Sequence, residues 1–327
     1  MNTVVSIIIC TRNRGDSLRE TLASISGCQI PADLPAELLV IDNGSTDGTK
    51  SVVQQTNMSN MPLRYTFEGQ NGKCHAHNRG MAEANGEVFL WTDDDVRVPA
   101  DWIERMCRPI VSGEVDAMQS GIKMAPHLRK PWLTRALAGI LLDWTPDRVE
   151  SPTLVGANMA FAKQVRERVP FFDPDLGPGA RGYYDDTLFG MQLVEAGYKI
   201  GFTPDAVVEH HFDESRLQHL SFLVGATAIG RSSAYVMHHW HHQTLPKLWL
   251  RLFYNLMKLG FAKFVRFFAS RDSAPISLLE REMTYRFALC RELIRFRGEP
   301  RHYVRHGLVR IDADGSSMIR TRETCQA

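Results

Sequence analysis

The sequence predicts an α/β fold, in which a mostly parallel sheet carries helices on both faces and a basic helical region follows it. Two observations support this fold class. In the first hundred residues, short β-branched runs alternate with segments of helical spacing, and the links between them are short. Strands and helices alternate in this way in parallel sheets. Polar clusters also follow three of the apolar runs directly, at the strand ends where such sheets bind ligands.

The individual elements can be assigned in chain order. We expect strands at Val4–Cys10, Glu37–Asp42, Leu63–Phe67 and Glu87–Thr92. Helices are expected between them, at Asp16–Ser26, Thr46–Asn57 and Lys73–Ala84. From residue 114 to 213 the pattern is less regular, with strands expected at Leu154–Ala162 and Lys199–Thr203 and a helix at Asp185–Ala196. The remaining part is expected to be mostly helical.

The net charge is only +1, but the charged residues are distributed unevenly between two regions of the chain. Glu214–Ala327 contains 18 Lys and Arg against 9 Asp and Glu, a balance of +9. Met1–Asp213 then holds 20 against 28, a balance of −8. We therefore expect a sheet domain at 1–213 and a basic helical region at 214–327. A basic region is compatible with an anionic membrane surface, nucleic acid or an acidic partner.

Cysteine usage and motif content narrow the class of protein. Six cysteines lie far apart, at positions 10, 28, 74, 107, 290 and 325, without a CxxC pair, which favours reduced thiols in a cytoplasmic protein. The first residues lead directly into a strand-like run, so we expect no signal peptide. No apolar stretch has the length of a transmembrane helix. Without a GxxxxGK[ST] or GxGxxG motif, P-loop and dinucleotide-binding proteins have no support.

The acidic run Asp93-Asp94-Asp95 follows an expected strand and is the strongest candidate site. Crowded carboxylates repel one another, and a counter-charge relieves that repulsion. Mg²⁺ and Mn²⁺ favour one or two carboxylates together with substrate phosphates. The run is therefore a candidate for a metal bound to a diphosphate, with a solvated acidic turn as the alternative. Two further polar clusters end neighbouring strands, at Thr11–Arg14 and at Asp42–Ser45.

Four runs carry a resemblance to a known family: VSIIICTRNR, LLVIDNGSTDGT, NRGMAEANGEVFLWTDDDV and GYYDDTLFGMQLVEAGYKIGFTPDAVVEH. In this order and spacing they resemble the signatures of family 2 glycosyltransferases, over about Val4 to His210. The resemblance implies the GT-A fold, a Rossmann-like α/β sheet. It also implies inverting transfer of a sugar from a nucleoside diphosphate sugar, UDP-sugars foremost, to a hydroxyl acceptor, with Mn²⁺ or Mg²⁺ as cofactor.

The resemblance implies nucleotide-binding roles for several positions. Thr11 and Asn13 match the loop that holds the nucleobase and ribose, and Arg12 lies between them. Asp42-Asn43 matches an acidic pair that contacts the base, and Asn in second place leaves the choice of nucleotide open. The positions expected near the nucleotide and its phosphates are Lys73 and Asn78-Arg79. For Lys73 the alternative is a solvated lysine at a helix start.

Metal binding is implied for Asp93 and Asp95, which match the family's DxD motif. Asp95 is the expected ligand, and Asp94 could share that role because three consecutive carboxylates leave the register open. His210 matches a position after PDAVV where a neutral imidazole can bind Mn²⁺ or contact a phosphate. His211 is the competing register, and a hydrogen-bonded core histidine is the alternative.

The acceptor side is expected at Asp185-Asp186, which resembles the family's Glu-Asp pair at a helix start. An acceptor hydroxyl must lose a proton as it attacks, so a carboxylate within hydrogen-bond reach serves as general base. By position Asp186 is the base, and Asp185 holds the acceptor. The alternative is a pair of acids that complement the helix dipole. Gly156-Ala157-Asn158 resembles the segment lining the donor sugar and acceptor, or is merely a strand with a close backbone approach.

The basic region contains an amphipathic segment, Leu245–Ala269. On a helix its polar residues fall within about half the circumference, and the rest is Leu, Trp, Phe, Met and Val. Such a pattern suits a helix lying in the plane of a membrane interface. Packing on the sheet domain or in a dimer interface is the alternative. Before it, His238 and His242 stand one helical turn apart, which suits zinc, but a polar patch is favoured because no carboxylate or cysteine accompanies them.

We therefore expect a transferase acting on a glycan, a lipid-linked or a small-molecule hydroxyl acceptor in cell-surface polysaccharide or glycolipid assembly. It would be peripheral on the cytoplasmic face of a membrane and bind no nucleic acid. Two other classes stay open. A nucleotidyltransferase should show a Gly-rich loop after the first strand, whereas TRNRGDS has one glycine. A catalytically silent binding protein should lack the base or the metal carboxylates.

Overall fold

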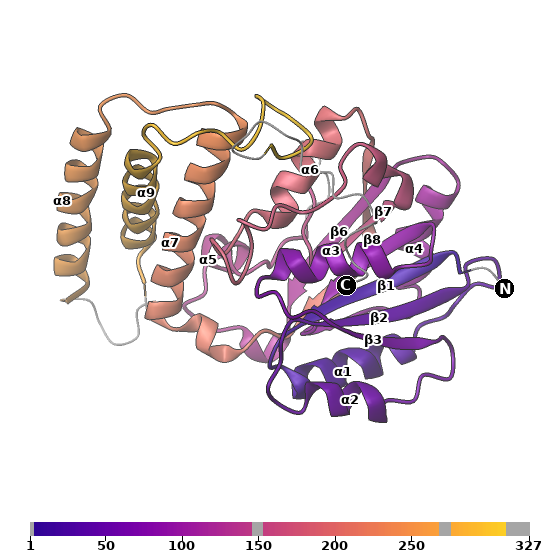
Figure 1. Cartoon of the computed structure of the whole chain (residues 1–327). Helices are drawn as coiled ribbons and strands as arrows, with labels where there is room; N and C mark the ends of the chain where they lie inside the picture. The colour runs from indigo at the N-terminus through magenta and orange to yellow at the C-terminus, as the bar shows by residue number, and fades with distance from the viewer. Residues whose placement is uncertain (1–2, 146–152, 268–275, 312–327) are drawn as a thin grey trace.

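The computed structural model describes residues 3–145, 153–267 and 276–311, and contains an eight-stranded sheet in the order β3-β2-β1-β4-β7-β6-β8-β5. Four strands form its parallel half, namely β1 (Val5–Thr11), β2 (Ala36–Asp42), β3 (Leu63–Phe67) and β4 (Val88–Asp93). These strands match the expected ones within about one residue, and the predicted α/β fold class is confirmed (Figure 1).

The other half of the sheet is mixed and less predictable. β7 (Asn158–Ala162) runs antiparallel to β4 and to β6 (Ala117–Met124). β8 (Ile200–His210) runs parallel to β6 and pairs with the short edge strand β5 (Val96–Arg97). The sequence did not predict β5 or β6, because β5 has only two residues and AMQSGIKM of β6 has little of the β-branched character on which strand prediction depends. The expected strands also began too early for β7 and ended too soon for β8.

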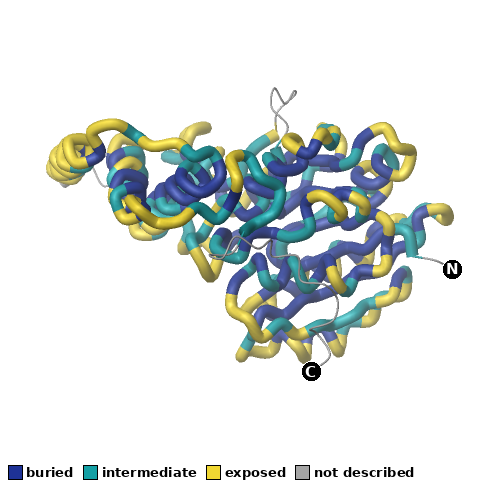
Figure 2. Tube along the Cα trace, turned by 45° about the horizontal axis from the view of Figure 1, so that its top comes forward, coloured by how far each residue is buried: buried dark blue, intermediate teal, exposed yellow. Residues whose placement is uncertain are grey.

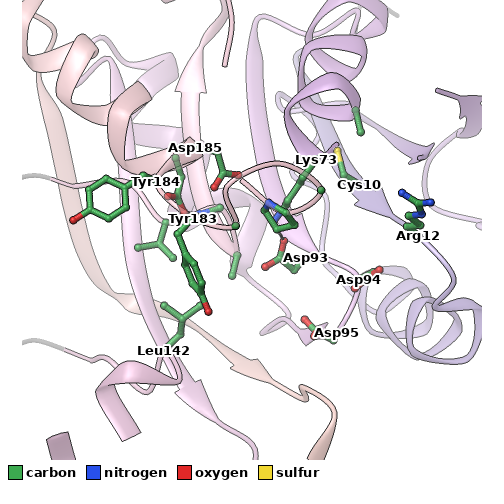
Figure 3. A pocket seen from close by; sticks show the side chains of 18 of the residues that line it. Cys10, Arg12, Lys73, Asp93, Asp94, Asp95, Leu142, Tyr183, Tyr184 and Asp185 are labelled. Atoms are coloured by element: carbon green, nitrogen blue, oxygen red, sulfur yellow. Dashed lines mark hydrogen bonds and ion pairs between the residues drawn. The ribbon is translucent and has the colours of Figure 1, made fainter. Parts of the chain in front are cut away.

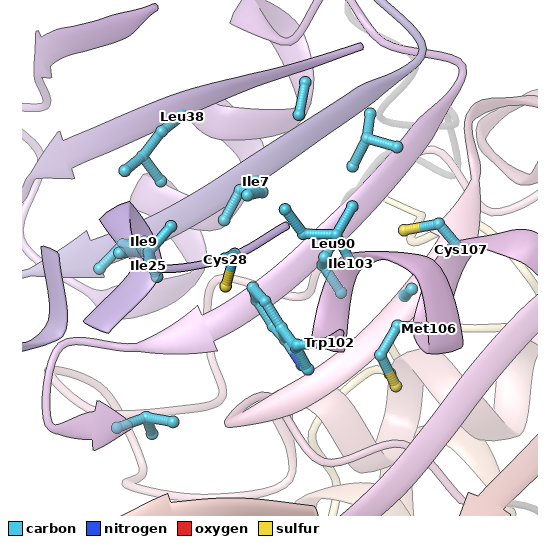
Figure 4. Close-up of a cluster of buried hydrophobic side chains, with 14 of the residues drawn as sticks. Ile7, Ile9, Ile25, Cys28, Leu38, Leu90, Trp102, Ile103, Met106 and Cys107 are labelled. Carbon is cyan, nitrogen blue, oxygen red and sulfur yellow. The ribbon is translucent and has the colours of Figure 1, made fainter. Parts of the chain in front are cut away.

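Helices cover both faces of the sheet. α1 (Gly15–Ser26), α2 (Thr49–Gln55) and α4 (Trp102–Val111) contribute to one buried cluster, with Ile7 and Ile9 of β1 and with Trp102 and Met106 of α4 (Figure 4). α3 (Lys73–Glu83) and α6 (Asp185–Glu195) contribute to the other, with Ile8 of β1. Because β1 is buried on both faces, its sequence is a continuous apolar run rather than an alternating one.

Short helices connect the middle of the chain. They are a 3₁₀ turn at Pro126–Leu128, α5 (Arg135–Ile140), and 3₁₀ turns at Lys163–Glu167 and Glu214–Leu217. Thr134 caps α5 by accepting a hydrogen bond from the Leu137 amide. Asp213 caps the last turn in the same way, through the Ser215 amide.

The C-terminal region forms a helical layer beside the sheet, as expected. It contains α7 (His219–Tyr235), a π-helical turn at Val236–Trp240, α8 (Leu248–Phe267) and α9 (Leu278–Arg295). α9 packs against both α7 and α8, so α8 lies farthest from the sheet (Figure 1). Among the described helices, none combines the length and the apolar character that crossing a bilayer requires. The expected helix Leu245–Ala269 starts three residues late, and its last two residues lie outside the described part.

The two histidines considered for zinc are buried or half-buried in the helical layer. His238 donates to the Glu299 carbonyl at 3.3 Å, and His242 donates to the Tyr303 carbonyl at 3.0 Å. His238 also stacks on Phe296, with ring centroids 5.2 Å apart. Within the described ranges, no three His, Cys, Asp or Glu side chains are grouped to hold a metal ion. The zinc alternative is therefore not supported for these residues.

Candidate functional site

A cavity of about 600 Å³ lies at the carboxyl ends of β1 and β4, where polar clusters were expected from the sequence. Asp93, Asp94 and Asp95 line one side, from the end of β4 and the turn after it. Asp185 and Asp186 line the other, from the first turn of α6. Figure 3 shows the two acidic groups facing the same space. Segments far apart in the sequence therefore meet in one site.

Each carboxylate of the acidic run pairs with a cationic side chain. Asp93 pairs with the Lys73 ammonium at 2.6 Å. Asp94 accepts a hydrogen bond from the Thr11 hydroxyl at 2.7 Å and pairs with Arg14 at 3.1 Å. Asp95 pairs with the same Arg14 guanidinium at 2.7 Å. The run is therefore not a solvated turn.

Burial and neighbouring charges move the pKa values of Asp94 and Asp95 in opposite directions. Burial raises the pKa of Asp94 to about 6, because the Arg14 charge only partly offsets the lost hydration and the neighbouring Asp95 adds to the rise. Burial also acts on Asp95, but the His210 ring and the Arg14 guanidinium outweigh it and hold the pKa of Asp95 below its usual range. Of the two, Asp95 is thus the carboxylate that keeps its charge to lower pH.

Asp95 and His210 form the part of the site that best fits a metal ion. His210 Nε2 lies 3.2 Å from Asp95 Oδ1, and both residues are buried. Yet Asp95 Oδ1 makes no hydrogen bond to the described residues, nor does His210 Nδ1. A buried oxygen without a hydrogen bond is costly, and a cation bound by Asp95 and His210 would satisfy it. Asp93 pairs with Lys73, and its expected share in metal binding stays a prediction.

Lys73 is a half-buried cation that lines the cavity. Its backbone amide donates to the Pro178 carbonyl at 2.8 Å, which fixes the start of α3 against the loop before α6. Burial alone would lower the pKa of the ammonium, but the carboxylates of Asp93 and Asp185 outweigh it and raise the pKa. The alternative of a solvated lysine is therefore wrong, and the site holds a permanent positive charge.

The α6 carboxylates differ in their surroundings. Asp186 accepts hydrogen bonds from the backbone amides of Gly156 at 2.8 Å and Thr187 at 2.6 Å, while burial raises its pKa. Burial, followed by repulsion from Asp186, raises the pKa of Asp185 to about 7. Tyr184, directly before them, adopts φ of +74°, a conformation that non-glycine residues rarely take outside functional or strained sites.

The expected nucleotide-binding positions lie near one another, but most of their polar atoms bind other protein groups. Arg12 contacts Asn71, and both line the cavity. Asn43 lines it too, while its side chain donates to the Gln70 carbonyl at 2.6 Å and accepts from the Gly72 amide at 2.9 Å. Asn43 thus holds the loop after β3 in place, which gives the Asn of this sequence a structural role.

Asp42 and Asn13 do not line this cavity. Asp42 accepts hydrogen bonds from the Tyr65 hydroxyl at 2.8 Å and the Ser45 amide at 2.7 Å. Asn13, at φ of +53°, accepts from the Thr46 amide at 2.7 Å and lines a second, polar cavity on the other side of Arg14. Asn13 thus joins the loops after β1 and β2, and Asp42 joins the loop after β2 to β3.

Two further expected site residues are structural. Asn78 forms two hydrogen bonds with the backbone of Phe172, at 2.9 and 2.7 Å. Asn158 is fully buried, accepts from the Trp102 indole at 2.9 Å and donates to two backbone carbonyls. Neither lines the cavity, whereas Gly156 and Ala157, just before Asn158, do. The expectation that Asn158 lines the site is therefore wrong, because its side chain lies inside the core.

Several cavity residues carried little or no sequence signal. Arg14 belonged to the polar cluster after the first strand, but nothing local indicated that it would bridge Asp94 and Asp95. Tyr183 and Tyr184 adjoin Asp185, and adjacency to the acidic pair was their only signal. Ile229 comes from α7 and Leu142 from the segment before residue 146. No sequence motif could have assigned these two residues to the site. Ile229 reaches the cavity only because α7 packs beside it.

Comparisons with known proteins agree with the family that the sequence resembles. The family model described as glycosyl transferase family 2 matches residues 6–165. Glycosyltransferase AglE of Haloferax volcanii is 29% identical over 120 residues, which span 36% of this chain and 39% of that protein. The GalNAc(5)-diNAcBac-PP-undecaprenol beta-1,3-glucosyltransferase of Campylobacter jejuni is 37% identical over 94 residues, 28% of this chain and 29% of that protein. The matched segments thus cover well under half of these two relatives.

A solved structure extends the likeness beyond the sheet domain. The mannosyltransferase PcManGT from Pyrobaculum calidifontis, in complex with GDP-Man and Mn²⁺, aligns with a TM-score of 0.59 and 21% identity. The alignment covers 90% of this chain and 88% of that one. At this identity the likeness concerns the fold, and it includes most of the C-terminal helical layer.

Proposed function

Because the chain belongs to glycosyl transferase family 2, we propose that it is an inverting transferase that moves one sugar from a nucleoside diphosphate sugar to a hydroxyl acceptor. The observation that carries this proposal is the cavity itself. It combines a half-buried cation, Lys73, an ionised carboxylate beside an imidazole, Asp95 and His210, and a second acidic pair at Asp185-Asp186. A diphosphate needs the first two features, and an attacking hydroxyl needs the third.

We propose that the donor diphosphate lies between Lys73 and the Asp95–His210 pair. Asp95 and His210 would hold Mn²⁺ or Mg²⁺, with phosphate oxygens and water as the other ligands. Such a metal neutralises the charge that develops on the leaving diphosphate. Lys73 supplies a second positive charge, and Arg14 keeps Asp95 oriented through its 2.7 Å contact. UDP-sugars are our first expectation for the donor, and GDP-mannose is the alternative suggested by the PcManGT complex.

We propose Asp186 as the general base. Its two backbone hydrogen bonds fix the carboxylate at the helix start, and burial raises its pKa, which strengthens it as a proton acceptor. Asp185 would hold the acceptor. The printed name of the Campylobacter relative specifies an undecaprenol-linked acceptor, so we propose a lipid-linked glycan acceptor here. The chain would then work at the cytoplasmic face of a membrane.

A donor-hydrolysis and transfer screen tests the proposal. Purified full-length chain is incubated with UDP- and GDP-sugars, with Mn²⁺, Mg²⁺ or a chelator. We expect turnover of one donor that the chelator abolishes. Asp95→Asn should weaken metal-dependent donor binding. Asp186→Asn should lower transfer about 10²–10⁴-fold, the range of general-base catalysis, and leave donor binding intact.

Asp205→Asn, at an exposed carboxylate of β8 outside the cavity, is the matched control and should behave as wild type. If no sugar nucleotide binds or turns over, or if Asp95→Asn and Asp186→Asn are indistinguishable from wild type, the transferase assignment fails. The comparisons support a glycosyltransferase and give no support to a nucleotidyltransferase or a silent binding protein.

A further inference from the structure

The outer face of α8 is an exposed apolar surface that the proposed reaction does not use. Large apolar side chains lie exposed along this helix: Trp249, Leu250, Phe253, Tyr254, Leu256, Met257 and Phe261. Trp249 and Phe261 are each 61% exposed and Phe253 is 64% exposed. Isolated exposed apolar residues are ordinary, but a continuous row of aromatics on one helix marks an interaction surface. In Figure 2, α8 is the mostly exposed helix at the edge of the molecule farthest from the sheet.

The way α8 attaches to the body determines which side is free. Only a narrow stripe of α8 is buried, formed by Leu248, Asn255 and Ala262, with Leu252 and Leu259 half-buried. This stripe repeats every three to four residues and packs against α9, where Asn255 donates to the Cys290 sulfur at 3.8 Å. At about 100° per residue, the exposed aromatics are centred roughly 160° from that stripe. The most apolar side of the helix therefore points away from the protein.

Charge shows which partner this face suits. Arg251 and Lys258 follow one edge of the apolar face and Lys263 follows the other, all three exposed. Lys258 also lies over the Tyr254 ring, 4.6 Å from its centroid. From residue 245 to 267 the sequence contains no Asp or Glu. An apolar face between cationic edges is the arrangement of a helix lying in an anionic lipid interface, where lysine and arginine reach the phosphates.

A second copy of the chain is a poorer occupant of this surface. Two such faces brought together would place cationic edges beside cationic edges, without a carboxylate on α8 to pair with them. We infer that α8 docks the protein in the plane of an anionic bilayer, with Trp249, Phe253 and Phe261 inserted and with the Leu248–Ala262 stripe remaining on α9. This inference rests on the proposed function, because docking on a membrane would bring the site to a lipid-linked acceptor. Its test measures lipid binding alone.

Vesicle co-sedimentation of the full-length chain tests the inference. Vesicles of phosphatidylcholine alone are compared with vesicles of phosphatidylcholine and phosphatidylglycerol in equal parts. We expect binding to the anionic vesicles that weakens with added salt. Phe253→Ser with Phe261→Ser should weaken it more than about tenfold, because each inserted phenylalanine contributes through its apolar area. Lys258→Gln and Lys263→Gln should each weaken it about fivefold on anionic vesicles only.

Phe67→Ser with Val111→Ser is the matched control, since both side chains are large, apolar and exposed but lie on the sheet domain. This control should bind vesicles as the wild type does. Donor hydrolysis in solution should be unchanged in all of these variants, which separates failed docking from a failed transferase assignment. The inference is overturned if the wild type sediments with neither vesicle, or if the α8 variant binds as well as wild type. A dimer that the α8 variant converts to monomer, without vesicle binding, would also overturn it.

Discussion

At the scale of single residues, the site works by giving neighbouring carboxylates different surroundings. Asp94 and Asp95 share Arg14, yet only Asp95 also faces His210, and so only Asp95 has its pKa lowered. On the acceptor side, Asp185 and Asp186 are neighbours in one helical turn. Asp186 receives two backbone hydrogen bonds, while the pKa of Asp185 rises to about 7. The pKa values of Asp94 and Asp95 are thus shifted in opposite directions, whereas burial raises the pKa of both α6 carboxylates.

Asp185 should make the stability of the protein depend on pH. Its pKa is about 7 in the folded state against 3.8 for an ordinary aspartate, so the folded protein keeps a proton that the unfolded chain releases. The stability linked to this proton is present at low pH and is lost as pH rises from about 4 to about 7. Asp185→Asn mimics the protonated form. We therefore expect the variant to gain stability over wild type at about pH 8 and much less at about pH 4.

Denaturant unfolding of the two proteins at both pH values measures this difference. Asp16→Asn is the control, because the Asp16 side chain is 98% exposed and its replacement should give no pH-dependent change. A variant that is less stable than wild type at both pH values would contradict the prediction, since it would mean that the ionised Asp185 stabilises the fold.

At the scale of elements, close approach between helices depends on single glycines. α7 and α9 meet at Gly230, where a Cβ would lie 2.5 Å from the Tyr285 carbonyl oxygen and 2.9 Å from the Ala288 Cβ. A backbone carbonyl cannot rotate out of the way as a side chain can. Gly260, in the middle of α8, has no atom within 4 Å of the corresponding point. The two positions share helical backbone and differ only in their neighbours.

Alanine at these two positions should therefore act in opposite directions. Gly260→Ala should stabilise the protein by up to about 1 kcal/mol, because alanine restricts the unfolded chain and favours the helix. Gly230→Ala gains the same propensity but must separate α7 from α9, and we expect a net loss of about 1–3 kcal/mol, the usual cost of overpacking. Thermal and urea unfolding of both variants measures the difference. Equal changes of the same sign would show that α7 and α9 do not pack closely at Gly230.

At the scale of the whole molecule, the C-terminal segment is tied to the wall of the cavity. Asp173 is buried, and its carboxylate accepts hydrogen bonds from the Tyr235 and Tyr303 hydroxyls, each at 2.7 Å. Arg310 pairs with Asp173 at 3.0 Å and with Asp175 at 2.9 Å. The loop that follows Asp175 leads through Pro178 and Gly179 to the acceptor-side carboxylates. The helical layer therefore supports the site as well as carrying α8.

Removal of Arg310 should destabilise the fold well beyond a surface mutation. Arg310→Ala leaves Asp173 buried without its counter-charge, and breaking a buried pair from one side costs about 3 kcal/mol or more. Arg305→Ala, at an exposed arginine nearby, should change stability by less than about 0.5 kcal/mol. Urea unfolding of both variants distinguishes the two cases. If both changed stability equally, the Asp173 network would not hold the C-terminal segment to the site.

The sequence by itself determined the parallel half of the sheet and the edge at which the site lies. Continuous apolar runs such as Ile7–Ile9 predict buried strands, and polar residues that directly follow them must gather at one sheet edge. These are local patterns, so reading them requires no knowledge of distant contacts. The acidic run could be named on this basis, whereas Lys73 and Asp185-Asp186 were named through the resemblance to family 2 glycosyltransferases.

Only the tertiary structure decided which of those residues meet and which face of each helix is covered. Arg14 reaches Asp94 and Asp95 because β1 and β4 are adjacent, and Asn158 turns into the core because α4 presents Trp102 to it. The amphipathic pattern of α8 is visible in the sequence, but it does not say which side packs. Periodicity reports that a helix has two faces, and the choice between them depends on partners far along the chain, here α9.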